Sequence, residues 1–261
     1  MGVLNVTPDS FSDGGRYPSL DAAIAHGVRL RSEGADIVDV GGESTRPGAD
    51  PVPVGDELAR VIPVVGALAS EGIAVSIDTA KPEVAEAAVA AGAIVVNDVT
   101  GLRNPAMLAA VAASESGVVI MHMQGEPRTM QDDPQYGDVV IDVRDFLVER
   151  ARAAEAAGVA ADRIAIDPGI GFGKTFDHNL ALLRNLQVLV ETGYPVLLGA
   201  SRKAFLGQIL GGKVPAAERD PATGATVALA IEQRVAVVRV HNVAMTMQIA
   251  RTVEAILERS E

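Results

Sequence analysis

Side chains able to bind small molecules recur through this 261-residue chain, each just after a short apolar run. A carboxylate accepts two N–H groups of a flat heterocycle at once, and a lysine donates to a ring carbonyl. Asp167 and Lys203 are candidates for these roles. Arg239 and His241, two residues apart on one expected strand, face the same side and can form an anion site with Asn5. The whole set comprises Asn5, Thr45, Arg46, Asp78, Asn97, Met121, His122, Asp167, Lys203, Arg239 and His241.

Each of these residues also has a purely structural interpretation. Asp78 could cap the turn that follows it, and Asp167-Pro168 is a common turn start. Lys203 could be a solvated lysine at a helix start, while Arg239 and His241 could be a salt bridge and a core histidine. Capping explains single positions but not a whole set of polar strand ends.

Other kinds of site find no support in the sequence. The chain has no Cys, nothing in it resembles a Ser-His-Asp triad, and no His or carboxylate spacing suggests zinc. The glycines of Gly169-x-Gly171-x-Gly173-Lys174 resemble a phosphate loop but match neither the Walker A nor the Rossmann pattern. We interpret them as a tight loop that shapes a pocket.

Strand-like runs alternate with helical patterns along the entire chain. The expected strands cover residues 3–6, 37–40, 74–77, 94–96, 118–121, 164–166, 196–198 and 237–240. The expected helices cover 20–34, 58–69, 82–91, 106–113, 141–157, 180–190, 223–233 and 244–257.

This alternation predicts an α/β fold, a single (β/α)8 TIM barrel over residues 1–261, with long mobile loops after strands 1 and 2. In such a barrel the strand ends and the loops after them form the active face, which would gather the candidate residues. A doubly wound open sheet is the alternative, but no G-x-G-x-x-G follows the first strand.

The composition narrows the class of protein. Hydrophobic residues make up 48% and aromatic residues only 3%, so the core is built from Ala, Val, Leu and Ile. The formal net charge of -12 argues against a nucleic acid or an anionic membrane surface as partner. No apolar run approaches ~20 residues, and no signal peptide is evident, so a cytoplasmic protein is expected.

Several motifs together resemble the dihydropteroate synthase family over essentially the whole chain. They are N-V-T-P-D-S-F-S-D-G-G from Asn5, D-V-G-G-E-S-T-R-P-G from Asp39, S-I-D-T from Ser76, N-D-V-T-G from Asn97, D-P-G-I-G-F-G-K from Asp167, G-A-S-R-K from Gly199 and R-V-H from Arg239. The first motif and the S-R-K segment are highly specific, whereas S-I-D-T alone would be weak.

The resemblance implies a transferase of folate biosynthesis that is a target of sulfonamides. Such an enzyme joins 6-hydroxymethyl-7,8-dihydropterin diphosphate to p-aminobenzoate and releases 7,8-dihydropteroate and diphosphate. It also implies which residues hold the pterin: Asp78, Asn97, Met121, Asp167, Phe172, Gly199 and Lys203.

The same resemblance implies a diphosphate site formed by Asn5, Arg46, Arg202, Arg239 and His241, with Mg²⁺ bound through Asn5. One amide oxygen is a poor site alone, which suits an ion that arrives with phosphates and keeps several waters. Phe11, Thr45, Pro47 and Lys203 are expected to form the aminobenzoate pocket. The expected catalytic residues are Asp13, Lys203, Arg239 and His241, with Asp13 stabilising charge as diphosphate leaves.

A dissociative (SN1-like) mechanism follows from the resemblance. The C–O bond at the pterin methylene breaks first, since the electron-rich dihydropterin spreads the positive charge, and the neutral amine then attacks. Pterin contacts at rigid strand ends predict that the pterin substrate binds first. Aminobenzoate should bind only after the two loops have ordered, because ordering a loop costs ~1 kcal/mol or more per residue.

Two departures from the family pattern stand out. Many relatives have residues ahead of strand one, where this chain starts at Met1, so either the barrel floor is open or the start is trimmed. Relatives often carry Ser after the S-R-K lysine, where this chain has Ala204, so a carboxylate there would rely on backbone N–H groups at the helix start.

Two other functions remain as alternatives. A pterin-binding domain that passes a methyl group to a corrinoid would not need the first-loop motif or S-R-K, which this chain has. The intact set of Asn5, Lys203 and Arg239 argues against a catalytically silent module that binds pterin weakly. The Ala-, Val-, Met- and Ile-rich helices over 223–233 and 244–257 predict a homodimer through the last helices, as in the family.

Overall fold

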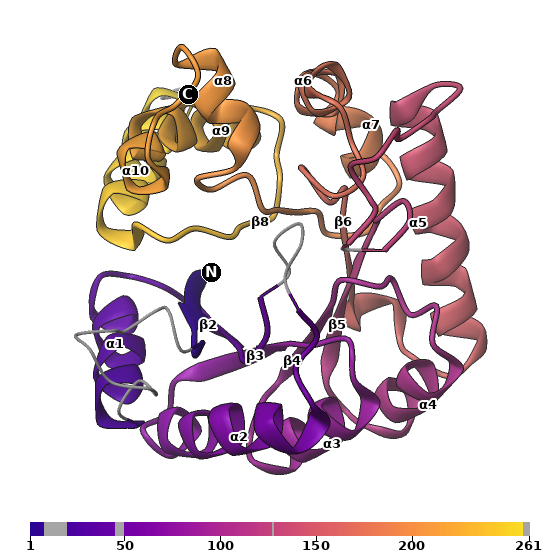
Figure 1. Ribbon diagram of the computed structural model, residues 1–261, viewed down its shortest axis with the longest axis vertical. Helices are drawn as coiled ribbons and strands as arrows, with labels where there is room; N and C mark the ends of the chain where they lie inside the picture. Colours follow the sequence, from indigo (N-terminus) through magenta and orange to yellow (C-terminus); the bar gives the residue numbers. More distant parts are fainter. Residues whose placement is uncertain (8–19, 45–49, 127, 258–261) are drawn as a thin grey trace.

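The computed structural model describes residues 1–7, 20–44, 50–126 and 128–257. It contains eight parallel strands: β1 (Gly2–Asn5), β2 (Ile37–Gly41), β3 (Ala74–Asp78), β4 (Val95–Asp98), β5 (Gly117–Met121), β6 (Ile164–Asp167), β7 (Leu197–Leu198) and β8 (Val237–Val238). The helices are α1 (Leu20–Ser32), α2 (Val54–Ser70), α3 (Pro82–Ala90), α4 (Pro105–Ala113), α5 (Val139–Ala156), α6 (Phe176–Arg184), α7 (Leu186–Val190), α8 (Ala204–Ile209), α9 (Asp220–Glu232) and α10 (Val243–Leu257). Helices lie outside the strands all the way round (Figure 1).

The eight strands form a closed ring. Strands β1 to β6 pair in sequence order as one sheet, and β7 pairs with β8. Parallel bridges between Ile166 and Val196 and between Gly2 and Val240 join the two sheets at both edges. At the second junction the N–H of Val3 donates to the carbonyl of Val240 over 3.0 Å. The predicted (β/α)8 barrel is therefore confirmed.

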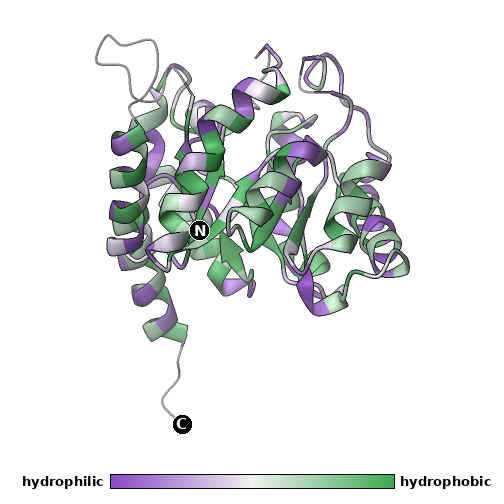
Figure 2. Cartoon of the chain, turned by 90° about the horizontal axis from the view of Figure 1, so that it is seen from below, coloured by the Kyte–Doolittle hydropathy of each residue, from purple (hydrophilic) through white to green (hydrophobic). Residues whose placement is uncertain are grey.

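The strands are built from β-branched and other aliphatic residues, as a sheet covered by helices requires. Leu4, Val38, Val40 and Ile77 have no exposed surface, and the core holds hardly any aromatic side chain. Figure 2 shows hydrophobic strands at the centre and helices that carry both hydrophobic and hydrophilic residues. Asp39, in the middle of β2, breaks the apolar pattern although it is also fully buried.

Local sequence signals set the starts of several helices. The Asn104 side chain accepts the N–H of Ala106 at the start of α4, and Asp138 accepts two N–H groups at the start of α5. Thr175 and His178 form a reciprocal capping box at the start of α6. These caps satisfy backbone donors that the first helical turn leaves unpaired.

Two expectations about the helices were wrong. Residues 180–190 do not form one helix, because the chain leaves the helical conformation at Asn185 and continues as α7. The second error is the start of α2, which begins four residues earlier than its apolar pattern indicates. The short helix α8 begins directly after Lys203, where a helix start was considered, but it is absent from the expected helices. Short helices and helix ends carry few residues from which a period can be read.

In the described part of the chain, no helix is long and apolar enough to cross a membrane. The loops expected to be mobile fall largely on residues 8–19 and 45–49, which lie outside the described residues.

Candidate functional site

Polar strand ends meet at one rim of the barrel. Asn5, Gly41, Asp78 and Asn97 are successive register partners across β1, β2, β3 and β4. Met121 and Asp167, at the ends of β5 and β6, are paired in the same way. Parallel strands place their carboxyl ends on one face, so side chains far apart in the sequence share this rim.

Arg239 binds side chains on two of these strands, β2 and β3. Its Nε donates to Oδ2 of Asp39 over 2.6 Å, and its Nη2 donates to Oδ2 of Asp78 over 2.7 Å. The Nδ2 group of Asn97 donates to the same Asp39 oxygen over 3.2 Å. Asp39 was not among the predicted site residues, although an acidic residue inside an apolar strand was a signal for it.

Burial changes the protonation of the two candidate pterin carboxylates. It raises the pKa of Asp78 to about 7, against the opposing charge of Arg239. Burial also raises the pKa of Asp167 to about 6, although the N–H of Gly169 donates to its Oδ1 over 2.7 Å. Burial disfavours the charge of Arg239, but Asp39 and Asp78 together raise its pKa above the ordinary value. Both carboxylates thus titrate near neutral pH, as groups in functional sites commonly do.

Lys203 and Gly199, two further candidate pterin residues, lie close to Asp167. The Nζ of Lys203 stands 3.9 Å from the centroid of the Phe172 ring, a cation–π contact. Phe172 and Met121 belong to a small buried apolar cluster separate from the main core. A Cβ built on Gly199 would lie 3.7 Å from Oδ2 of Asp167, so Gly199 and this carboxylate are neighbours.

Burial lowers the pKa of His241 to about 3, and the charges of Arg239, Arg202 and Lys203 act in the same direction. Its Nδ1 is 2.9 Å from Oγ of Ser201, and its backbone N–H donates to the same oxygen over 3.2 Å. In the tautomer in which the Ser201 hydroxyl donates to Nδ1, the neutral ring carries its proton on Nε2, which can donate to an anion.

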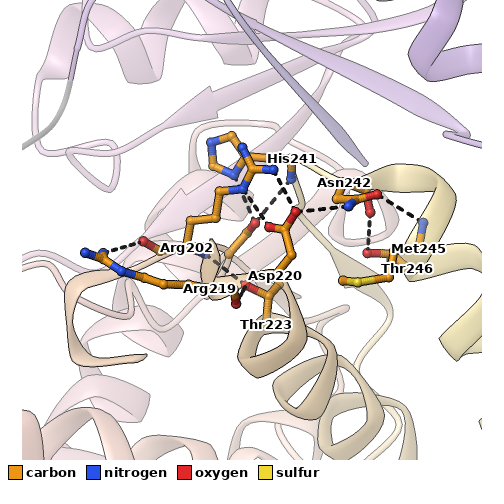
Figure 3. Close-up of polar contacts among 9 residues, drawn as sticks. Arg202, Arg219, Asp220, Thr223, His241, Asn242, Met245 and Thr246 are labelled. Carbon is orange, nitrogen blue, oxygen red and sulfur yellow. Dashed lines mark hydrogen bonds and ion pairs between the residues drawn. The ribbon is translucent and has the colours of Figure 1, made fainter. Parts of the chain in front are cut away.

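Arg202 forms a bidentate salt bridge with Asp220. Its Nε and Nη2 donate to the two carboxylate oxygens over 2.6 and 2.8 Å, and Asn242 donates to the same carboxylate (Figure 3). This pairing lowers the pKa of Asp220. Two donors of Arg202 are therefore committed to Asp220, a pairing that was not predicted.

The glycine-rich segment after β6 is a tight loop, as interpreted, and it packs against the end of β5. A Cβ on Gly169, where φ is +63°, would lie 1.9 Å from the carbonyl oxygen of His122. A Cβ on Gly173 would lie 2.5 Å from the carbonyl oxygen of Gln124. Only glycine allows this close approach of the two backbones.

The buried side chain of Lys174 joins this loop to His122, just after β5. Its Nζ lies 2.9 Å from Nδ1 of His122 and 2.9 Å from the carbonyl oxygen of Phe172, and the side chain is 2% exposed. Burial lowers the pKa of Lys174 to about 7 and the pKa of His122 to about 2. The contacts of Lys174 with His122 and with the Phe172 carbonyl therefore hold the loop that carries Phe172 in its conformation.

Five candidate residues lie outside the described residues: Phe11, Asp13, Thr45, Arg46 and Pro47. Within the described ranges, no three His, Asp or Glu side chains gather closely enough to hold a metal ion. A Cβ on Gly41 would lie 3.8 Å from Oδ1 of Asn5 and 3.7 Å from Oδ2 of Asp78, so these two oxygens flank Gly41 at the rim.

Comparison with known proteins identifies the family. Residues 1–241 match the family model described as pterin binding enzyme. Dihydropteroate synthase of Escherichia coli K12 is 45% identical over 262 residues, covering 100% of this chain and 92% of the relative. The chain belongs to the dihydropteroate synthase family. The resemblance that the motifs carry is thereby confirmed.

Solved structures of dihydropteroate synthases share the fold. The Xanthomonas albilineans enzyme with 4-aminobenzoic acid is 49% identical, with a TM-score of 0.93 over 100% of this chain and 93% of that one. The same enzyme in complex with 7,8-dihydropteroate is 46% identical, with a TM-score of 0.90 over 100% and 94%. The Yersinia pestis enzyme in a sulfonamide complex is 43% identical, with a TM-score of 0.94 over 99% and 94%.

Proposed function

We propose that this chain condenses 6-hydroxymethyl-7,8-dihydropterin diphosphate with p-aminobenzoate to give 7,8-dihydropteroate and diphosphate. The observation that carries the proposal is the meeting of Asp78, Asn97 and Asp167 with Lys203 and Arg239 at one barrel rim. These groups place hydrogen-bond acceptors for the N–H groups of a ring next to cations that can bind a diphosphate. The relatives with bound 4-aminobenzoic acid and 7,8-dihydropteroate support the same reaction.

The pterin ring would bind edge-on to the carboxylates, next to the Lys203–Phe172 pair. Asp167 would accept two ring N–H groups, because the N–H of Gly169 donates only to Oδ1 and each carboxylate oxygen can accept two hydrogen bonds. Lys203, placed against the Phe172 ring, would donate to the ring carbonyl. Asn97 would contribute an amide oxygen, and Met121 an apolar wall.

The diphosphate would occupy the side of the rim where Arg239 and His241 lie. Arg239 supplies a fixed positive charge, and His241 supplies a neutral N–H donor, since burial keeps its ring uncharged at neutral pH. Arg202 would assist through the edge of its guanidinium that Asp220 leaves uncovered. We assign Arg46 and Asp13 to this side as well, on the strength of the motifs alone.

The reaction would proceed by dissociation. The bond between the pterin methylene carbon and the diphosphate oxygen breaks first, and both electrons leave with diphosphate. Arg239 and His241 stabilise the departing charge, and the dihydropterin delocalises the positive charge left behind. The neutral amine of p-aminobenzoate then attacks the methylene carbon and loses a proton. No covalent bond to the enzyme is needed.

Mg²⁺ would be held by the amide oxygen of Asn5 together with diphosphate oxygens. A lone amide oxygen beside Asp78 suits an ion that keeps most of its waters. When bound, Mg²⁺ supplies charge neutralisation for the leaving group. In calorimetry the protein alone should bind Mg²⁺ weakly, and diphosphate with pterin should recruit it. Tight binding of Mg²⁺ to the protein alone would contradict this assignment.

The aminobenzoate pocket would combine Lys203 with Phe11, Thr45 and Pro47, and its loops would order after the pterin substrate binds. Calorimetry should then detect sulfonamide binding only in the presence of diphosphate, pterin and Mg²⁺. Equal sulfonamide affinity with and without these ligands would mean that the pocket is preformed.

We also propose a homodimer through the last helices. Only Val243 and Thr246 are buried along α10 in the single chain, while Ile256 and Leu257 are exposed at its end. Burying this helix against a second copy would remove apolar surface from water. Light scattering at micromolar concentration should give twice the 27.0 kDa chain mass, and a monomer mass would exclude the dimer.

The reaction itself is tested by measuring diphosphate release. Release should require dihydropterin diphosphate, p-aminobenzoate and Mg²⁺ together, and 7,8-dihydropteroate should appear in equal amount. Transfer of a methyl group to a corrinoid, or pterin binding without turnover, would refute the proposal.

A further inference from the structure

Asp39 lies in the centre of the site but has no place in the scheme above. Its side chain is fully buried inside the barrel. One oxygen, Oδ2, accepts two hydrogen bonds, from Nε of Arg239 and from Nδ2 of Asn97. The other oxygen, Oδ1, has no hydrogen-bond partner among the described residues.

Stability of the fold does not explain this residue. A buried carboxylate with one unpaired oxygen loses the hydration of that oxygen and gains nothing in return. Similarly shaped apolar side chains often replace buried ion pairs without loss of stability. Ser76, its register partner on β3, is equally buried and also makes no side-chain hydrogen bond to the described part of the chain. This layer of the barrel is therefore not arranged for stability.

The contact with Asn97 decides which way the amide points. An amide has a donor side and an acceptor side, and an ionised carboxylate can only accept. Because Asp39 accepts from Nδ2, the amide oxygen of Asn97 is on the side away from Asp39. Asn97 then presents an acceptor rather than a donor to a ligand at the rim.

The contact with Arg239 fixes the guanidinium in a similar way. Nε is held by Asp39 and Nη2 by Asp78, so the plane of the guanidinium is set by two carboxylates on neighbouring strands. The Nη1 group lies outside both of these pairs. A single carboxylate oxygen of Asp39 therefore contacts the two residues that would receive the two halves of the substrate.

We propose that Asp39 is a positioning residue that sets the acceptor face of Asn97 toward a pterin N–H and the orientation of Arg239 toward the diphosphate. The inference rests on the proposed function. It adds that recognition of the ring and recognition of the leaving group depend on one buried side chain.

The decisive variant is Asp39→Asn, which keeps the shape of the side chain but offers an amide in place of the carboxylate. The KM for dihydropterin diphosphate should rise at least about tenfold, the loss expected for one charged hydrogen bond. The affinity for a pterin without phosphates and the affinity for inorganic diphosphate with Mg²⁺ should both fall in calorimetry. The KM for p-aminobenzoate should change little.

Ser76→Ala is the matched control, because it alters the same barrel layer without touching Asn97 or Arg239. It should leave both affinities at the wild-type level. The exchange variant, Asp39→Asn with Asn97→Asp, places an acceptor at position 97 again and should recover pterin affinity at least about tenfold over Asp39→Asn alone. A purely structural role would not give this recovery.

The outcomes separate the inference from the proposed function. If the wild-type protein makes no 7,8-dihydropteroate, the proposed function fails. If the wild type is active and Asp39→Asn binds pterin and diphosphate as the wild type does, the positioning role is refuted. The role is also refuted if Ser76→Ala gives the same losses. If Asp39→Asn does not fold, the exchange variant is compared with Asn97→Ala. Pterin affinity near the wild-type level in the exchange variant, together with loss of pterin affinity in Asn97→Ala, supports the positioning role. Equal losses of pterin affinity in both variants overturn it.

Discussion

Replacing buried Lys174 should change how the stability of the protein depends on pH. Lys174 gives up its proton near pH 7 in the folded protein because it is buried beside His122, whereas an unfolded lysine does so near its ordinary pKa of 10.5. Between these values the unfolded chain binds more protons. The free energy of unfolding therefore rises with pH through this window.

The size of the effect follows from the shift in pKa. Each pH unit inside the window adds up to about 1.4 kcal/mol, and Lys174 is still half protonated in the folded protein at pH 7. The wild type should gain about 2 kcal/mol from this one group between pH 7 and pH 9. Lys174→Met has no proton to lose and should lack this gain.

Urea denaturation of the wild type and Lys174→Met at pH 7, 8 and 9 measures the difference. Lys213→Met, which replaces an exposed lysine, is the control and should run parallel to the wild type. A constant difference between the wild type and Lys174→Met across this range would refute the reasoning. It would mean that the acceptors around Nζ keep the lysine charged despite its burial.

Three further predictions concern the candidate pterin site. Gly169→Ala should destabilise the fold by more than about 3 kcal/mol in urea denaturation, because its Cβ would overlap the carbonyl oxygen of His122. The control Gly72→Ala, at positive φ in open space, should cost about 1–2 kcal/mol. Affinity for a phosphate-free pterin should fall about tenfold per pH unit below pH 6, as Asp167 gains the proton that blocks ring binding; an affinity independent of pH would contradict this. Phe172→Leu should weaken the same binding about three- to tenfold by removing the cation–π contact with Lys203, and unchanged binding would refute it.

The overall fold followed from the sequence because every strand carries a signal of its own. Each is a short aliphatic run that polar residues follow closely, and helices such as α2 and α10 keep a helical period. The exceptions lie where that period is short or interrupted. Asn185 divides one expected helix into α6 and α7 by its conformation, and α8 has only six residues.

The rim of the site followed from the rule that strand ends share one face. Asp78, Asn97 and Asp167 lie there as expected, although their roles stay predictions. Contacts between distant side chains could not be predicted in this way. Neither the Arg202–Asp220 pair nor the Lys174–His122 contact has a fixed spacing in the sequence, since each depends on how loops pack.

The ring of strands closes between the first residues of the chain and residue 240. During synthesis on the ribosome, β1 therefore emerges early and waits for a neighbour that is made more than two hundred residues later. Until then, the sheet of β1 to β6 has two open edges rich in aliphatic residues, which are prone to pair with other chains. The closing step joins sequence-distant segments and is expected to be slow. Newly made chains thus pass through a stage in which a chaperone that shields strand edges would raise the yield of native protein.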